Sequence, residues 1–189
     1  MDACDSLSPR NVLDLAVLGV ASERARTAAE VISVVKRVGG ARFQPTADVV
    51  AGRIAALAEA GLLTTPDRAP ARASGEIRWL PSVSGRAHVQ RLLMTQSASP
   101  ADALAAVCAC LKICFLEMLE PDARDAVIVD LMAAHRRALD RAQAALAGCP
   151  CRCAFVQRCL ARDVERWESE LIWLETLAGE VESARPWRL

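Results

Sequence analysis

The sequence predicts a mainly α-helical protein with one small sheet in its N-terminal half. Residues 55–64, AALAEAGLLT, have the pattern of a helix that ends on a glycine and turns directly into a short apolar strand. Residues 78–86, RWLPSVSGR, predict a returning strand followed by a capped helix. These observations predict an N-terminal winged helix-turn-helix with a two-stranded wing, followed by an all-helical C-terminal dimerisation domain.

Three short helices are predicted before the wing. Ser8 stands directly before a proline, which is typical of a helix start. Residues 27–30, TAAE, form a capping box that opens a second helix, which a pair of glycines ends. The third helix starts near Thr46, carries apolar residues at helical spacing, and ends at Gly61.

The wing follows the third helix. Residues 62–65 and 76–80 predict its two strands, and residues 66–75, rich in proline and arginine, predict a mobile tip between them. Ser82 caps a fourth helix. We expect the winged-helix domain to span residues 1–96 and the helical domain to span residues 97–189.

The second half predicts three further helices. The first runs from Ser99 to Leu119 and the second from Pro121 to Gly148, with a cysteine-rich break before a last helix over residues 155–182. The apolar residues of that last helix step by four and three: Leu160, Val164, Trp167, Leu171, Leu174, Ala178 and Val181. Such a heptad seam requires a partner helix, so we expect an obligate homodimer.

Composition and charge indicate the source and the cellular compartment of the protein, and which half of the chain suits phosphates. The chain has 189 residues, 53% hydrophobic content and equal numbers, 23, of basic and acidic residues. Residues 1–95 carry 12 basic and 9 acidic side chains, so the first half is the more suited to phosphates. The chain has only two lysines and is rich in alanine, which indicates a bacterial source. Its sequence has no pattern that predicts a leader peptide or a membrane-spanning segment. We therefore expect a cytoplasmic protein with mostly reduced cysteines.

Four segments resemble the PadR-like winged-helix transcriptional regulators, in the subgroup whose C-terminal domain is of the virulence-activator type. They are residues 15–20, 54–63, 78–86 and 168–177 (ESELIWLETL). The resemblance implies a homodimer that binds double-stranded DNA and responds to a small-molecule effector. The small residues of the third helix, Ala47, Ala51, Gly52, Ala55 and Ala56, also leave open a winged-helix module that binds a protein partner instead of DNA.

The third helix is the expected recognition helix, and the wing would follow phosphates. Glutamine pairs well with adenine, and arginine with guanine or phosphate. The candidate DNA-binding residues are Arg42, Gln44, Thr46, Arg53, Arg68, Arg72 and Arg78.

Four residues of the last helix are candidates for dimer or effector contacts. They are Trp167, Leu171, Trp173 and Leu174. The resemblance implies that apolar and aromatic side chains near a dimer axis line an effector site. Trp167 lies on the heptad seam, which favours a role in the dimer core.

The eight cysteines include one group around the last helix break and one on the helix before Leu119. Cys149, Cys151, Cys153 and Cys159 form the first group, and Cys108, Cys110 and Cys114 form the second. Either could hold a soft metal or sense redox state, or serve as small core residues. His88 and His135 have no acid or nucleophile at catalytic spacing, so we expect no enzyme and no cofactor.

Overall fold

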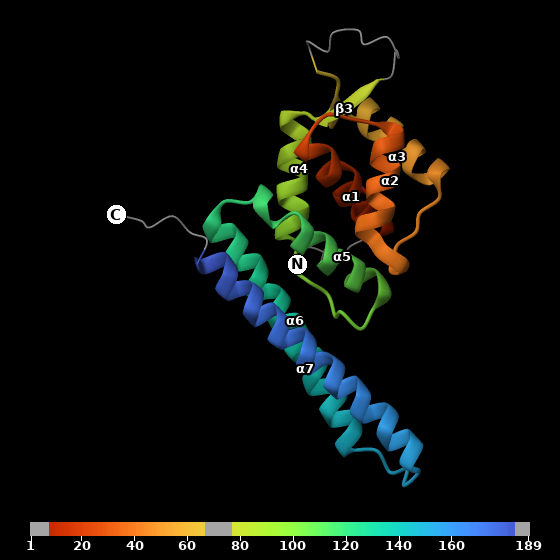
Figure 1. Ribbon diagram of the computed structural model, residues 1–189, viewed down its shortest axis with the longest axis vertical. Helices are drawn as coiled ribbons and strands as arrows, with labels where there is room; N and C mark the ends of the chain where they lie inside the picture. The colour runs from red at the N-terminus through yellow and green to blue at the C-terminus, as the bar shows by residue number, and fades with distance from the viewer. Residues whose placement is uncertain (1–7, 67–76, 184–189) are drawn as a thin grey trace, which may run out of the picture. The chain divides into compact units, whose positions relative to one another are not determined.

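The computed structural model describes residues 8–66 and 77–183 and divides the chain into two compact units, Met1–Thr95 with Val107–Leu119 and Gln96–Ala106 with Glu120–Leu189 (Figure 1). The elements are α1(Pro9–Glu23), β1(Arg26–Thr27), α2(Ala28–Gly39), η1(Gly40–Arg42), α3(Ala47–Glu59), β2(Leu63–Thr64), β3(Arg78–Pro81), α4(Val83–Met94), α5(Ala103–Cys114), η2(Leu116–Met118), α6(Pro121–Ala147) and α7(Ala154–Ser183). This architecture confirms the predicted mainly α-helical fold with a winged helix in the first half.

Helix α1 is the centre of the first unit. Every residue from Val12 to Ala21 is buried, and the helix contacts α2, α3, α4 and β3. Because a helix that is apolar on all sides must be covered on all sides, α1 draws the other elements of the unit around it.

Hydroxyl side chains start four helices, as the sequence predicts. Ser8, Thr27, Thr46 and Ser82 each accept a hydrogen bond from a backbone N–H in the first turn of the helix that follows. Thr27 completes a full capping box, since the Glu30 carboxylate also accepts from the Thr27 N–H. Each cap satisfies one of the donors that a helix start leaves unpaired.

The sheet has three antiparallel strands rather than the two of the predicted wing. β3 is central: Arg26 of β1 pairs with Trp79, and Leu63 of β2 pairs with Pro81. The two-residue strand β1 was not predicted, because a pair of polar residues has no hydrophobic period and pairs only through the tertiary fold. The expected tip between the wing strands falls mostly outside the described residues.

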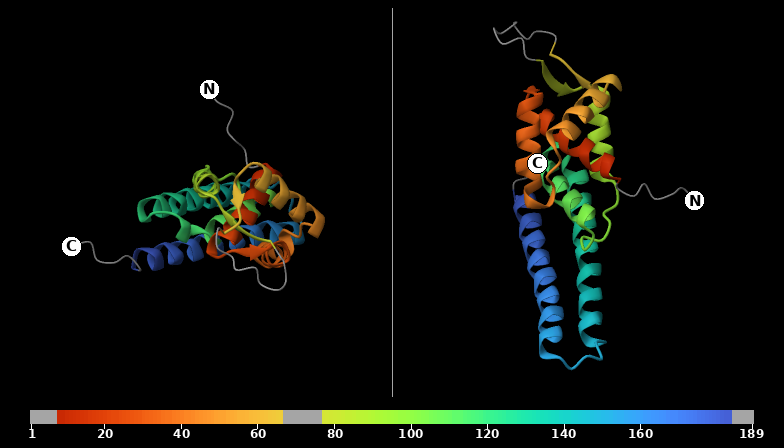
Figure 2. Two further views of the ribbon diagram at one scale, coloured as in Figure 1. Left: turned by 90° about the horizontal axis from the view of Figure 1, so that it is seen from above. Right: turned by 90° about the vertical axis from the view of Figure 1, so that its right-hand side faces the viewer.

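The second unit contains a helical hairpin. α6 and α7 lie side by side and are joined by the turn over residues 148–153 (Figure 2). A small core of Ala138, Leu139, Trp167 and Leu171 holds them together. The heptad seam of α7 therefore finds its partner helix within the same chain. Within the described ranges, no helix is both long and apolar enough to cross a membrane.

Helix α5 starts later than predicted and contributes to both units. Its first turn is capped by Asp102, whose carboxylate accepts from the N–H groups of Leu104 and Ala105. Residues 107–119 belong to the first compact unit, where buried Lys112 donates to the Thr95 carbonyl oxygen. The boundary between independently folding domains at residue 96 stays a prediction.

Gly19 of α1 is the position where the packing around this helix leaves no room for a side chain. A Cβ added there would overlap the ring of Phe115, whereas a Cβ added at Gly52 of α3 would meet nothing within 4 Å. We expect Gly19→Ala to lower the free energy of unfolding by about 1 to 3 kcal/mol through overpacking. The matched variant Gly52→Ala should raise it by roughly 0.5 to 1 kcal/mol, because alanine favours a helix interior. Urea denaturation measures both, and equal stabilities would contradict the packing.

Candidate nucleic-acid interface

Helix α3 has one buried side and one exposed side, as a recognition helix requires. Val50, Ile54 and Leu57 are buried. The exposed side comprises Ala47, Asp48, Val49, Ala51, Gly52, Ala55 and Glu59. It carries two acidic side chains and no basic one, so its capacity for hydrogen bonding to base edges is small.

Arg53 points away from this exposed side. Its guanidinium binds the carboxylate of Asp14 on α1 through two nitrogens, with Nη2 2.7 Å from Oδ2. The side chains of Arg53 and Asp14 are 13% and 3% exposed. A buried carboxylate needs such a partner, since an unpaired buried charge is costly. Arg53 therefore joins α3 to α1, and the DNA contact expected of it forms no part of the function proposed below.

His88 of α4 completes this buried polar cluster. Its Nε2 lies 3.4 Å from Asp14 Oδ2, and its Nδ1 lies 2.6 Å from Nη2 of Arg91. The sequence showed no acid near His88 because Asp14 stands far upstream in the chain. The cluster links α1, α3 and α4 of the unit.

Gln44 and Thr46, two further candidates for DNA contacts, serve the helix ends. The Gln44 side-chain amide donates to the carbonyl oxygens of Lys36, at 3.0 Å, and Gly40 at the end of α2. Thr46 caps α3. Both side chains are exposed, but their polar atoms already bind backbone groups that helix ends leave unpaired.

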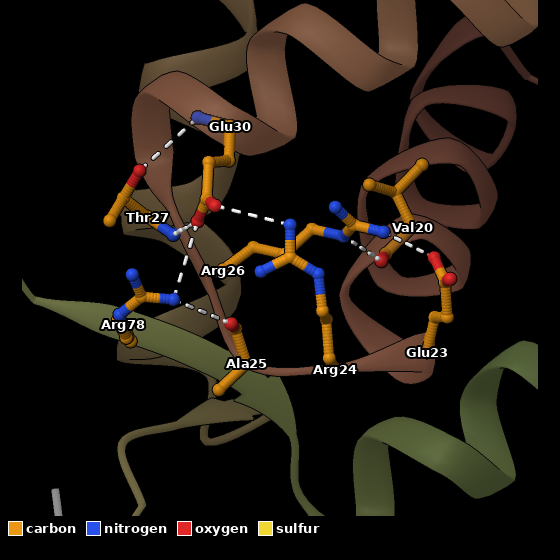
Figure 3. A network of polar contacts seen from close by, with 8 residues as sticks. All are labelled: Val20, Glu23, Arg24, Ala25, Arg26, Thr27, Glu30 and Arg78. Atoms are coloured by element: carbon orange, nitrogen blue, oxygen red, sulfur yellow. Dashed lines mark hydrogen bonds and ion pairs between the residues drawn. The ribbon is translucent and has the colours of Figure 1, made fainter.

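Arg78 belongs to a network of charges at the start of α2 (Figure 3). Its Nη1 donates to the Ala25 carbonyl oxygen at 3.1 Å and lies 3.6 Å from the Glu30 carboxylate. Arg24 binds the same carboxylate at 3.2 Å. The hydrogen bond from the Thr27 N–H, together with the two arginines, lowers the pKa of Glu30. Arg78 is thus partly buried and engaged, whereas the Arg24 side chain is 54% exposed.

Two exposed arginines of the first unit belong to the helix-turn-helix segment. Arg42, which ends η1 between α2 and α3, and Arg37 of α2 are exposed and make no ion pair with any residue that the structure describes. Arg42 is the described candidate whose charge remains available, while Arg68 and Arg72 lie outside the described residues. Arg24 and Arg37 were not predicted as DNA contacts from the sequence. The position of Arg24 just before the capping box was a signal for it, because phosphates bind at helix N-termini.

The candidate dimer and effector residues separate into two groups. Trp167, Leu171 and Leu174 are buried within one chain, and the Trp167 ring packs edge-on against His135 with centroids 5.9 Å apart. These three residues are therefore unavailable to a partner subunit, contrary to the expectation that the seam of α7 forms the dimer core. Trp173 is 50% exposed and remains a candidate contact.

The cysteines do not assemble a metal centre in the part of the chain that the structure describes. No three side chains among histidine, cysteine, aspartate and glutamate are placed there to share a metal ion. Cys151, Cys153 and Cys159 are exposed, and Cys149 is half-buried.

Solved structures similar to this chain include those of Bacillus subtilis PadR. The complex of that protein with operator DNA has 17% identity, covers 90% of this chain and 99% of its own, and gives a TM-score of 0.42. The complex with p-coumaric acid has 16% identity, covers 94% and 99%, and gives 0.41. No protein-family model and no curated protein matches the chain.

The Arg53–Asp14 pair predicts a stability effect in place of a loss of DNA contacts. Arg53→Ala leaves a buried carboxylate without its partner, so we expect it to lower the free energy of unfolding by about 3 to 5 kcal/mol. The double variant Asp14→Ala/Arg53→Ala should be less destabilised than Arg53→Ala alone, because no buried charge is left. A double-mutant cycle in urea measures this coupling, and additive effects would show that the pair is not coupled.

Proposed function

We propose that this protein is a DNA-binding transcriptional regulator of the PadR-like kind. The observation that carries the proposal is the winged helix itself, in which α3 is half-exposed and N-capped and the exposed cation Arg42 lies in the segment between α2 and α3. A cation that precedes a helix start suits the DNA backbone, since phosphates bind through charge and backbone N–H groups. The proposal rests on these elements of the chain and not on the distant structural similarity.

Phosphate contacts supply most of the affinity in this proposal. Arg24, Arg37 and Arg42 are the exposed cations around α2 and α3, and Arg68 and Arg72 of the wing stay predictions. The exposed side of α3 reads bases mainly by apolar contact, because small side chains such as Ala51 and Val49 can pack on thymine methyl groups. Affinity should therefore depend strongly on salt.

A homodimer is the second part of the proposal. Ile172 and Trp173 on α7 are 63% and 50% exposed, and Val129 on α6 is 65% exposed. These side chains, with Phe155 and Val156 near the start of α7, are the large apolar side chains that stay exposed on the described hairpin after the seam is covered. A second copy that covers Ile172 and Trp173 would remove part of this surface from water. Two copies present two recognition helices to successive major grooves, and Trp173 is the proposed contact for a small-molecule effector. We place this regulator in the bacterial cytoplasm.

A second candidate function is a winged-helix module that binds a protein partner. The observation that favours it is the exposed side of α3, where Arg53 is turned inward and only Asp48 and Glu59 are charged. Small residues there permit close approach of another helix. If the protein binds no DNA duplex even at low salt, this second candidate function is favoured.

DNA binding is tested by replacing Arg42. The duplex to be used is the DNA upstream of the gene that encodes this protein. We expect Arg42→Ala to weaken binding to this duplex. It should also reduce the slope of log K against log salt concentration by about 0.9, the value for one phosphate contact. Arg162→Ala, which removes an exposed arginine of α7, is the matched control and should leave the slope unchanged. Fluorescence anisotropy over a salt series measures both. Equal slopes for all three proteins would remove Arg42 from the interface.

Two tryptophans on α7 separate folding from dimerisation. Trp167→Ala should lower the free energy of unfolding by about 3 to 5 kcal/mol, because its buried ring joins the two helices of the hairpin. Trp173→Ala should leave stability at limiting dilution nearly unchanged but weaken self-association. Urea denaturation and sedimentation velocity measure the two effects. A wild-type protein that sediments as a monomer at micromolar concentration would exclude the proposed dimer.

A further inference from the structure

The turn between α6 and α7 gathers thiols that the proposed function does not use. Cys149, Cys151 and Cys153 lie in the turn, and Cys159 follows in α7. The backbone of the turn is held by its neighbours: the Gly148 N–H donates to the Ala144 carbonyl oxygen at 2.8 Å, and the Gln157 side chain donates to the Cys151 carbonyl oxygen at 2.8 Å. Four thiols, of which all but that of Cys149 are exposed, are thus concentrated at this turn and the start of α7.

Cys153 occupies a special place among them, because it immediately precedes the 30 residues of α7. Its carbonyl oxygen accepts from the Gln157 N–H at 3.1 Å, which is the first bond of the helix and makes Cys153 the N-cap residue. Hydrogen bonds from the backbone N–H groups of Val156 and Phe155 to the Cys153 thiol lower its pKa. A helix N-terminus stabilises a thiolate in this position, and the thiolate is the nucleophilic form.

Thiols elsewhere in the chain have the opposite character. Burial raises the pKa of the Cys108 thiol to about 11, against a smaller opposing effect of Lys112. The hydrogen bond with the Cys110 thiol, together with desolvation, raises the pKa of Cys114. The thiols of Cys108 and Cys114 are mainly protonated at neutral pH. An oxidant or electrophile should therefore react faster with Cys153 than with either of them.

We propose that Cys153 is a site of oxidative modification by peroxides and that a neighbouring cysteine of the same turn, Cys149 or Cys151, converts it to a disulfide. The Cys153 thiolate sulfur attacks one oxygen of hydrogen peroxide, the O–O bond breaks, and the departing hydroxide takes up a proton to become water. Cys153 is then a sulfenic acid, oxidised by two electrons while the peroxide is reduced. The second thiol attacks that sulfur, the S–O bond breaks, and a second water leaves with the thiol proton.

The first test compares alkylation of Cys153 with that of Cys159, which is also exposed. The full-length reduced protein is treated with substoichiometric iodoacetamide at pH 7, and modified peptides are quantified by mass spectrometry. We expect Cys153 to react severalfold faster than Cys159, because Cys153 lies at the N-terminus of α7, where the helix favours a thiolate. Cys159→Ser should keep the fast phase and Cys153→Ser should lose it; serine retains the N-cap, so that variant should fold. Faster reaction of Cys159 or Cys110 would overturn the assignment.

The second test uses hydrogen peroxide. The wild-type protein should yield a turn peptide two mass units lighter, with Cys153 in a disulfide to Cys149 or Cys151. The double variant Cys149→Ser/Cys151→Ser should instead accumulate a sulfenic acid at Cys153 that dimedone traps. A wild-type protein that forms no disulfide at Cys153, or a dimedone adduct on another cysteine, would overturn the proposal. Neither test requires DNA, so the result does not depend on the proposed regulator function.

Discussion

The burial of α1 is the constraint on which the first unit depends. A helix that is covered from Val12 to Ala21 leaves Asp14 without water, and its carboxylate must find a cation inside the protein. Arg53 supplies it from α3. Because Arg53 must face α1, the rotation of α3 about its own axis is fixed, and the residues on the opposite side of α3 become the exposed surface. The composition of the candidate DNA-facing surface thus follows from a charge buried on another helix.

Much of the fold could be predicted from local signals. Helix starts follow from hydroxyl caps such as Thr27 and Thr46, and the end of α3 follows from Gly61, whose φ of 70° favours glycine. These signals act within a few residues, so a sequence contains them completely. The strand β1 carries no such signal. Its pairing with β3 depends on residues about 50 positions downstream.

The candidate site was less predictable, because the same side chain can serve DNA or the fold. Gln44 and Thr46 have the polar groups that read or bind DNA, yet these groups form hydrogen bonds with backbone atoms at nearby helix ends. The pairing of Arg53 with Asp14 joins two helices and has no local pattern. The heptad seam of α7 was identified correctly, but a seam specifies only that a helix covers it. Whether that helix is α6 or a second copy depends on the length and course of the turn between them.

The near absence of lysine has a consequence for how the charge of this protein can be changed. All but two of its 23 basic residues are arginine, and one of the two lysines, Lys112, is buried with its ammonium group bound to a backbone oxygen. Arginine stays protonated at any physiological pH and is not a target of acetylation, so nearly all of the positive charge of the protein is insensitive to both. Lys36 on α2 is the remaining side-chain amine within reach of acylating agents. An amine-directed dye would therefore label this protein at one lysine, beside the helix-turn-helix.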